Sequence, residues 1–344
     1  MVTLRASGSS APALLVRHRA RVARELYRTA PTHGSMTGLM AAYHMGWVDR
    51  DGRPDEAPPG KLIRPSLCLW ACEAAGGTAG ATMRMACAVE WAHNFTLVHD
   101  DIQDGDRERR HRETVWSVWG AAQGINAGDA IHAFAFELLL GGGDRSPARR
   151  LRAGRVLARA IGELVEGQSR DLALEGRLAA GPDAYLRMAR AKTGALFGAC
   201  LEGGALLGGA PAAVGARLRR AGELLGLAFQ VRDDWLGIWG DPARTGKSRD
   251  GDLDRRKVTY PVLAGYAAMP APERRRFRAL FAHAEPAVDE LRALLERRAA
   301  DELAAGAAVG FAGDAIALVS GCGLGDTFNG EFEEFARYVA NRQR

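Results

Sequence analysis

Apolar residues recur at intervals of three and four positions along most of this chain, whereas stretches that alternate apolar and polar residues are nearly absent. The first spacing collects apolar side chains on one face of an α-helix, and alternation would collect them on one face of a β-strand. The pattern therefore predicts an all-α protein. Long helices are expected over residues 13–28, 62–73, 82–104, 127–140, 148–174, 182–207 and 215–239, and shorter helices are expected to follow.

The segments between these helices are rich in Gly, Pro and Asp, which favour turns and loops. None of them has the length of a linker between domains, and the sequence has no internal repeat of fixed period. We therefore expect residues 1–344 to form one domain, a single large antiparallel helix bundle, with a flexible tail at residues 1–10.

Composition narrows the class of protein. With 344 residues, 47% of them hydrophobic, the chain can bury a large core. Its five cysteines lie mostly in apolar runs without the CxxC spacing of a metal or redox site, which is typical of a reducing compartment. No apolar run reaches the roughly 20 residues of a membrane span, and the first residues do not resemble a secretory signal. We expect a cytoplasmic protein with no stable membrane insertion.

The formal net charge of +5 is modest, and the arginines are spread along the chain or mixed with acids. Charge alone would allow a nucleic-acid partner, but no binding motif accompanies it. We therefore interpret the charges as a solvated surface and expect no nucleic-acid partner.

A first carboxylate cluster follows the apolar run at residues 95–98. Asp100 and Asp104 are four positions apart, so a helix places them on one face with Asp101 beside them. Their mutual repulsion favours a bound cation, and Mg²⁺ prefers such oxygen donors while keeping positions open for substrate phosphates. Guanidinium groups, which bind phosphate oxygens in pairs, follow at Arg107, Arg109, Arg110 and Arg112. The alternative is a solvated helix end where acids collect.

A second, shorter cluster closes another long helix at Asp233 and Asp234. The position four residues after Asp233 holds Gly237 and not an acid. Asp241 lies beyond Gly240, where we expect the helix to end, so it should not complete the same face.

The segment after this second cluster contains Lys247 and Lys257 among glycines and acids. Two lysines beside an acidic helix end suit a mobile lid over phosphate groups. Taken alone, the segment could equally be an ordinary charged loop.

The order of these motifs resembles that of the trans-prenyltransferases, the all-helical isoprenyl diphosphate synthases that include farnesyl and geranylgeranyl diphosphate synthases. The motifs are in register from about residue 60 to residue 263. The matching positions are Gly60 to Pro65, Glu90, His93, Asp100 to Asp104, Arg109, Arg110, Glu166 to Gln168, Asp171, Lys192, Thr193, Phe229, Gln230, Asp233, Asp234, Lys247, Asp252 and Lys257.

The resemblance implies a helix bundle of the isoprenoid synthase type with a central active-site cavity. It implies Mg²⁺ as cofactor, with three ions when substrate is bound and Mn²⁺ as a substitute. The implied metal ligands are Asp100, Asp104 and Asp233, with Asp101 and Asp234 supporting them.

The resemblance also implies two substrates, isopentenyl diphosphate and an allylic diphosphate (dimethylallyl, geranyl or farnesyl). Positions that match isopentenyl diphosphate contacts are Lys61, Arg64, His93 and Arg110. Positions that match allylic diphosphate contacts are Arg109, Lys192 and Lys257, with Lys247 closing on the diphosphate. Thr193 and Gln230 match residues near the carbocation, so the implied catalytic set is Lys192, Thr193, Gln230 and Arg109.

The chain departs from the family pattern at three positions. His111 and Glu113 stand where the family usually has glycine and proline, which leaves the shape of that loop open. Gly237 replaces the third aspartate of the second motif, and this replacement could weaken the third metal site or leave its water ligands to other groups.

Product length in the family depends on side chains just before the first motif. Phe95 lies five residues before Asp100, about 7.5 Å along a helix axis, and Thr96 is small. The pair resembles the geranylgeranyl type, so a C20 product is expected, with C15 or longer products as alternatives. Phe95 could also be plain core packing.

Two other functions remain as alternatives. A terpene cyclase of the same fold would act on one allylic diphosphate, but the positions for isopentenyl diphosphate at Lys61, Arg64 and His93 are all present. A non-catalytic regulatory subunit of another synthase would be expected to lose its first metal cluster, which is intact. The resemblance also implies a homodimer, to which apolar helical faces such as residues 127–140 could contribute.

Overall fold

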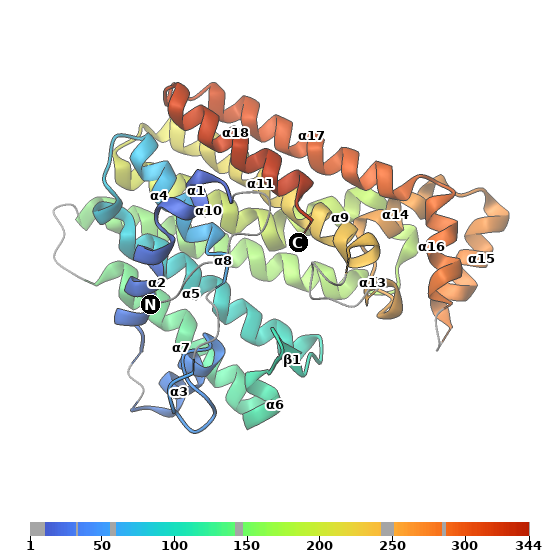
Figure 1. Cartoon of the computed structure of the whole chain (residues 1–344), viewed down its shortest axis with the longest axis horizontal. Coiled ribbons are helices and arrows are strands. Elements are labelled where there is room, and N and C mark those ends of the chain that lie inside the picture. Colours follow the sequence, from blue (N-terminus) through green and yellow to red (C-terminus); the bar gives the residue numbers. More distant parts are fainter. Residues whose placement is uncertain are drawn as a thin grey trace. The chain divides into compact units, whose positions relative to one another are not determined.

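The computed structural model describes residues 11–31, 34–55, 60–141, 147–241, 251–283 and 287–343. Nearly all regular structure in these ranges is helical, which confirms the all-α prediction (Figure 1). Internal contacts divide the chain into two compact units, Met1–Ala158 with Ala199–Gly215, and Arg159–Gly198 with Ala216–Arg344. The single domain stays a prediction, and the tail at residues 1–10 lies outside the described residues.

The first unit is built around the long helix α5. This helix packs against α4 and α7, and its residues are buried on almost every side. Small residues allow the close packing: a Cβ atom at Gly128 of α7 would lie 2.1 Å from Nε2 of His99 on α5. The helices that lie wholly in this unit are α1 (Ala13–Arg17), α2 (Arg19–Arg28), α3 (Met36–His44), α4 (Ile63–Ala74), α5 (Ala79–Gln103), α6 (Val115–Trp119) and α7 (Ala121–Leu140).

The second unit contains the C-terminal helices, of which α17 and α18 lie side by side (Figure 1). Its elements are η1 (Leu178–Ala180), α9 (Gly181–Ala189), the π-helical turn η2 (Arg190–Gly194), α13 (Gly251–Asp254), α14 (Tyr260–Ala268), α15 (Ala271–Ala282), α16 (Val288–Glu296), α17 (Ala300–Ser320) and α18 (Asp326–Asn341). Three helices have residues in both units: α8 (Pro147–Leu174), α10 (Ala195–Gly208) and α11 (Ala212–Trp239).

Four local features differ from the helices expected from periodicity. The helix expected over residues 13–28 is broken at His18, and the one expected over residues 182–207 is interrupted by the π-helical turn. The helix α3 was not expected; it begins at Ser35, whose side chain accepts a hydrogen bond from the amide of Gly38 at 3.1 Å. A short antiparallel hairpin, β1 (Glu108–Arg109) with β2 (Arg112–Glu113), corrects the expectation of no strands.

Helix α17 also corrects the expectation that no apolar segment reaches membrane-spanning length. By length and composition it could cross a membrane. Its most apolar stretch of 18 residues has a mean hydropathy of 1.7, and 28% of that stretch is buried. A single helix of this kind is weak evidence for a span, because packed helices of soluble proteins satisfy the same criterion. Helix α17 packs against α18 and α14.

Candidate active site

The first aspartate motif lies at the C-terminal end of α5, where its three carboxylates have different environments. Asp101 is fully buried, Asp100 is partly exposed, and Asp104, which caps the helix, is exposed. Oδ1 of Asp101 accepts a hydrogen bond from Nε of Arg109 at 2.7 Å and forms an ion pair with Nη2 of the same residue, also at 2.7 Å. Its Oδ2 is buried and has no partner in the described part of the chain. Burial raises the pKa of Asp101 to about 6, although Arg109 acts against that shift.

Arg109 reaches Asp101 because the hairpin turns the chain back toward α5. The two turn residues, Arg110 and His111, have φ angles of 53° and 62°, as a two-residue hairpin turn requires. The loop that the sequence left open is therefore a tight hairpin with two non-glycine residues in the left-handed region. This turn also brings Arg110 against Gly60, where an added Cβ atom would lie 3.3 Å from Nη2 of Arg110.

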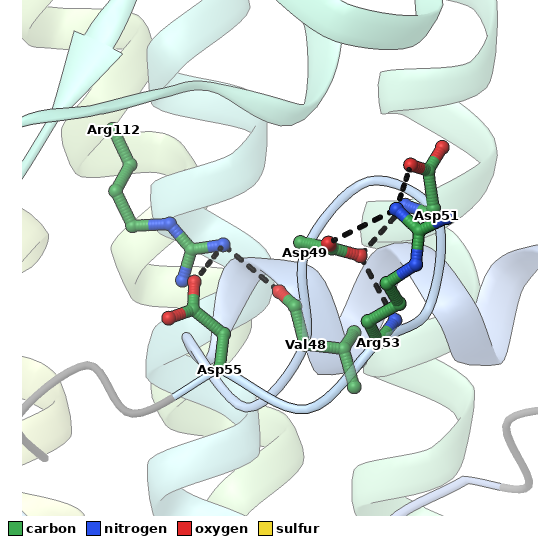
Figure 2. A network of polar contacts seen from close by, with 6 residues as sticks. All are labelled: Val48, Asp49, Asp51, Arg53, Asp55 and Arg112. Atoms are coloured by element: carbon green, nitrogen blue, oxygen red, sulfur yellow. Dashed lines mark hydrogen bonds and ion pairs between the residues drawn. The ribbon is translucent and has the colours of Figure 1, made fainter.

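Arg112, on the returning strand, binds the neighbouring loop. Figure 2 shows its Nη2 donating to the carbonyl oxygen of Val48 at 2.9 Å and pairing with Asp55 at 3.3 Å. Its guanidinium group lies over the ring of Tyr43, 4.6 Å from the centroid. Within the loop, Oδ1 of Asp49 accepts from the amide of Arg53 at 2.8 Å. The guanidinium of Arg112, which we expected at a bound phosphate, thus holds this loop to the hairpin.

Two residues predicted to contact isopentenyl diphosphate, Arg64 and Arg110, lie near the buried carboxyl group of Glu90, and both also lie near a third, His93. Burial raises the pKa of Glu90, and the charges of Arg64 and Arg110 oppose this shift. Burial, followed by the same two arginines, holds the pKa of His93 well below its usual range. The structure therefore brings these side chains, from α4, α5 and the hairpin, into one positively charged region. Lys61 is exposed just before α4.

A small cavity of about 80 Å³ lies beside this region, lined by Asp101, Arg109 and Arg110 together with Tyr43 and His44 of α3. Nδ2 of Asn94 donates to the carbonyl oxygen of Glu90 at 2.8 Å, so its Oδ1 faces His44 Nε2 at 3.0 Å. His44 is therefore the donor in that pair. Burial, and secondarily the charges of Arg109 and Arg110, lowers the pKa of His44 to about 3. His44 is not among the residues predicted from the sequence, because α3 was not expected.

The second motif lies near the end of α11, where Asp234 is buried among hydrogen-bond donors. Its Oδ1 accepts from Nε2 of Gln230 at 3.0 Å. Its Oδ2 accepts from the backbone amide of Tyr260 at 3.1 Å and from the hydroxyl group of Tyr185. Burial and the nearby charge of Asp252 raise the pKa of Asp234 to about 7. No motif predicted Tyr185 or Tyr260 as partners of Asp234, since both come from other helices.

Asp233, the other aspartate of this pair, is more accessible. Its side chain is 34% exposed, and Oδ1 accepts from Nη2 of Arg342 at 2.9 Å. Arg342 follows α18 and is buried, and its guanidinium group lies 4.0 Å from the ring centroid of Phe229. A basic residue near the C-terminus thus neutralises a predicted metal ligand. Sequence reasoning missed this contact because 109 positions separate the two residues.

The π-helical turn places two more predicted catalytic residues. Nζ of Lys192 pairs with Oδ2 of Asp171 at 2.6 Å, and the hydroxyl group of Thr193 donates to Oε1 of Gln230 at 2.8 Å. The turn packs closely on α8, because a Cβ atom at Gly167 would lie 2.2 Å from the amide nitrogen of Lys192. Gly167 is therefore required by close approach of the backbones.

The position of the missing third aspartate is filled by another residue. A Cβ atom at Gly237 would lie 2.0 Å from Oδ2 of Asp252, so the carboxylate of Asp252 occupies the space where a side chain at 237 would begin. Lys257 is exposed shortly after α13, and its amide donates to the carbonyl oxygen of Asp252 at 2.8 Å. Lys247 lies outside the described residues, so its role stays a prediction.

The carboxylates fit the predicted metal, Mg²⁺. Within the described residues, no group of three acidic, histidine or cysteine side chains is arranged to hold an ion by protein ligands alone. Mg²⁺ is commonly held by one or two carboxylates plus substrate phosphates, so such a cage is not required. The partnerless Oδ2 of Asp101 and the exposed carboxylates of Asp104 and Asp233 are suitable oxygen donors. Which of these groups bind metal stays a prediction.

The predicted chain-length residues are both buried on α5. Phe95 is 5% exposed, and its ring lies 4.7 Å from that of His132 on α7 and 5.9 Å from that of His99. Thr96 is 6% exposed, and its hydroxyl group donates to the carbonyl oxygen of His93 at 2.8 Å. Phe95 therefore belongs to the packed interface between α5 and α7.

Comparisons with known proteins agree on one family. The family model described as polyprenyl synthetase matches residues 56–297. A geranylgeranyl diphosphate synthase of Mycobacterium tuberculosis is 46% identical over 252 residues, covering 73% of this chain and 71% of the relative. A (2E,6E)-farnesyl diphosphate synthase of the same organism is 41% identical over 310 residues, covering 88% and 86%. A polyprenyl synthetase from Streptomyces coelicolor A3(2), known from its crystal structure, has a TM-score of 0.89 at 37% identity, covering 95% and 98%. This chain therefore belongs to the polyprenyl synthetase family, the trans-isoprenyl diphosphate synthases.

Proposed function

We propose that this trans-prenyltransferase condenses isopentenyl diphosphate with an allylic diphosphate and releases a short-chain all-trans prenyl diphosphate, with geranylgeranyl diphosphate as the main product. One observation carries the proposal. Arg64 and Arg110 lie near both the buried Glu90 and His93, in the same unit as Asp101 and its partner Arg109. Guanidinium groups from separate elements that meet beside carboxylates suit a diphosphate held together with a metal ion.

The reaction breaks one bond and forms another. The C–O bond of the allylic diphosphate breaks, and its electron pair leaves with the diphosphate. The double bond of isopentenyl diphosphate attacks the resulting cation, a C–C bond forms, and a proton passes to the released diphosphate. Lys192 and Arg109 would bind the departing group, while Thr193 and Gln230 would lie near the cation.

Magnesium supplies Lewis-acid stabilisation of the departing diphosphate when it is bound. Asp100, Asp104 and Asp233 would hold it, with Asp101 and Asp234 supporting them, and we expect three ions when substrate is present and Mn²⁺ as a substitute. The ion pairs between Asp101 and Arg109, and between Asp233 and Arg342, keep these carboxylates balanced by positive charge.

The C20 product depends on Phe95 as the floor of the product cavity. Replacing Phe95 by Ala should open space beneath the growing chain and shift the product mixture toward longer prenyl groups. The measurement is product analysis after incubation with labelled isopentenyl diphosphate and farnesyl diphosphate. Phe134→Ala is the matched control, because Phe134 packs in the same α5–α7 interface against Trp91. An unchanged product spectrum for Phe95→Ala, or equal lengthening in both variants, would remove Phe95 as the floor.

Two alternative functions can be distinguished from the synthase by one experiment. The pure protein is incubated with Mg²⁺, labelled isopentenyl diphosphate and each allylic primer in turn. A synthase incorporates label into a longer prenyl diphosphate. A terpene cyclase would form hydrocarbon from an allylic diphosphate alone, and a regulatory subunit would form no product. The gathering of Arg64, His93 and Arg110 supports the synthase, since neither alternative needs a second diphosphate site.

We also propose a cytoplasmic homodimer without nucleic-acid partners or stable membrane insertion. Exposed apolar side chains on α7, Ile125 at 48% and Leu140 at 45%, support an association surface on that helix. Sedimentation equilibrium of the pure protein tests the dimer, and Ile125→Lys should weaken it. A monomer at micromolar concentration would contradict the proposal.

A further inference from the structure

The hydrogen bonds around Asp234 have a fixed direction. Oδ1 of Asp234 accepts a hydrogen bond from Nε2 of Gln230 at 3.0 Å. The NH₂ group of Gln230 therefore faces Asp234, and its carbonyl oxygen faces Thr193. That oxygen accepts from the Thr193 hydroxyl group at 2.8 Å. The hydroxyl hydrogen of Thr193 is thus committed to Gln230, and the lone pairs of Thr193 face other directions.

Asp234 itself is held in place by three helices. Gln230 lies one turn earlier on α11, Tyr185 comes from α9, and Tyr260 begins α14. Asp234 is 5% exposed, so water does not compete for its oxygens. A carboxylate fixed by donors from separate elements can impose one orientation on the amide it contacts.

We infer that Asp234 is a positioning residue that acts through Gln230 to keep the lone pairs of the Thr193 hydroxyl group, and not its hydrogen, directed toward the cationic intermediate. The inference rests on the proposed function, which places Thr193 and Gln230 near that cation. An oxygen lone pair stabilises developing positive charge, whereas an O–H hydrogen directed at it opposes the charge. Asp234 needs no contact with the substrate to have this effect.

This role differs from that of a metal ligand, which the sequence pattern suggested for Asp234. Both of its oxygens already accept hydrogen bonds from buried protein donors. The adjacent Asp233 is 34% exposed and is therefore better placed to bind an ion. Asp233 is consequently the candidate metal ligand and Asp234 the positioning residue. The same substitution at each position can therefore be compared in one experiment.

The variant Asp234→Asn should reverse the chain of hydrogen bonds. Two donors, the Tyr260 amide and the Tyr185 hydroxyl group, point at the position of Oδ2, so the carbonyl oxygen of the new amide must take that position. Its NH₂ group then faces Gln230, which has to flip and present its own NH₂ group to Thr193. Thr193 becomes an acceptor, and its hydrogen turns away from Gln230.

We expect Asp234→Asn to lower kcat by about 10- to 100-fold, while KM for the allylic diphosphate stays within about twofold. The affinity for Mn²⁺ in the presence of inorganic diphosphate, measured by electron paramagnetic resonance, should remain that of the wild type. Asp233→Asn is the matched control and should weaken Mn²⁺ binding. Equal weakening in Asp234→Asn would overturn the inference in favour of a metal ligand, and so would wild-type kcat in that variant.

A second substitution tests the direction of the hydrogen bonds from Thr193 through Gln230 to residue 234. In Gln230→Glu combined with Asp234→Asn, the glutamate accepts from the new amide and from Thr193, so the original direction returns with the same number of charges. This double variant should recover at least about tenfold in kcat over Asp234→Asn. If Asp234→Asn does not fold, the Gln230→Glu/Asp234→Asn variant is compared with a Gln230→Met/Asp234→Asn variant, whose methionine cannot accept a hydrogen bond from Thr193. Equal kcat values in these two double variants would refute the inference. So would a Gln230→Glu/Asp234→Asn variant that recovers no kcat over Asp234→Asn.

Discussion

Gly237 on α11 lies directly against the carboxylate of Asp252. An added Cβ atom at this glycine would lie 2.0 Å from Oδ2 of Asp252, so that carboxylate occupies the space where a side chain would begin. Asp252 comes from α13, which begins 14 positions further along the chain at Gly251. A glycine on α11 is therefore what allows α13 to place its aspartate against the second motif, close enough to raise the pKa of Asp234.

Restoring the aspartate of the family pattern at position 237 should consequently lower the stability of this protein. In Gly237→Asp the new side chain would meet Asp252, and we expect the free energy of unfolding to fall by about 1–3 kcal/mol through overpacking and like-charge repulsion. Adding Asp252→Ala should recover most of that loss. Thermal or urea unfolding measures both effects.

Gly306→Asp serves as the control for this pair. Gly306 is also a helical glycine, on α17, but an added Cβ atom would have nothing within 4 Å. Its replacement should change stability by only about 0.5 kcal/mol. If Gly237→Asp melted at the temperature of the control, Asp252 would not be the obstacle that the geometry indicates.

The sequence predicts charged candidates for the site, but it does not predict which of them pair with one another in the structure. Spacing on a helix placed Asp100 and Asp104 on one face, because that relation involves only four positions. The partnership of Asp233 with Arg342 spans 109 positions and depends on where α18 ends against α11. Local periodicity carries no information about such a contact.

At the level of elements, the close approach of α8 to the π-helical turn positions Lys192 and Thr193. Gly167 of α8 has no side chain to separate the two backbones, and an added Cβ atom would lie 2.2 Å from the amide nitrogen of Lys192. Lys192 can then reach Asp171, four residues after Gly167 on the same helix. The turn and the helix thus form one structural unit.

Gly167→Ala should push the π-helical turn away from α8. We expect a loss of about 1–3 kcal/mol in the free energy of unfolding, because the obstacle is backbone and cannot rotate aside. Steady-state kinetics should show a lower kcat as Lys192 and Thr193 move. The measurements are urea unfolding and product formation at saturating substrate.

Gly162→Ala provides a control on the same helix. An added Cβ atom there would meet nothing within 4 Å, so this change should raise stability by about 0.5–1 kcal/mol through helix propensity alone. A gain in stability for Gly162→Ala together with a loss for Gly167→Ala would support the close approach at Gly167. A stabilised and fully active Gly167→Ala variant would contradict it.

Periodicity predicted α5, α8 and α11 well, because each is long and carries an apolar pattern over many turns. It missed the π-helical turn, whose extra residue per turn is stabilised by tertiary packing at Gly167. It also missed the hairpin, since strands of two residues are too short to alternate. Sequence patterns therefore predicted the long helices, while the short elements that position Arg109, Lys192 and Thr193 depend on contacts between helices.

For the whole molecule, buried histidines make stability depend on pH. The pKa of His44 is about 3 in the folded protein, against an ordinary value near 6.5, and that of His93 is also well below its usual range. As the pH falls below 6.5, the unfolded chain takes up protons at these positions while the folded protein does not. Their contribution to stability is therefore present at neutral pH and is lost progressively from pH 6.5 toward pH 3.

Buried carboxyl groups with raised pKa values act in the opposite direction over part of the same range. The pKa values of Asp101 and Asp234 are raised to about 6 and about 7, so the folded protein binds these protons before the unfolded chain does. Each contributes stability at low pH that is lost as the pH rises through its folded pKa. The unfolding curve of the wild type alone would consequently mix both effects.

The contribution of His44 to the pH dependence can be measured as the difference in unfolding free energy between the wild type and a His44 variant. His44→Gln keeps a donor facing Asn94 but removes the titrating ring, so the contributions of Asp101 and Asp234 cancel in the comparison. Relative to this variant, the wild type should lose about 1–2 kcal/mol of unfolding free energy between pH 7 and pH 5, a value reduced because the imidazole is not fully enclosed. Urea unfolding at intervals of half a pH unit measures the difference. A difference that stays constant over this range would mean that His44 takes up its proton equally in the folded and unfolded states, which its burial beside Arg109 and Arg110 should prevent.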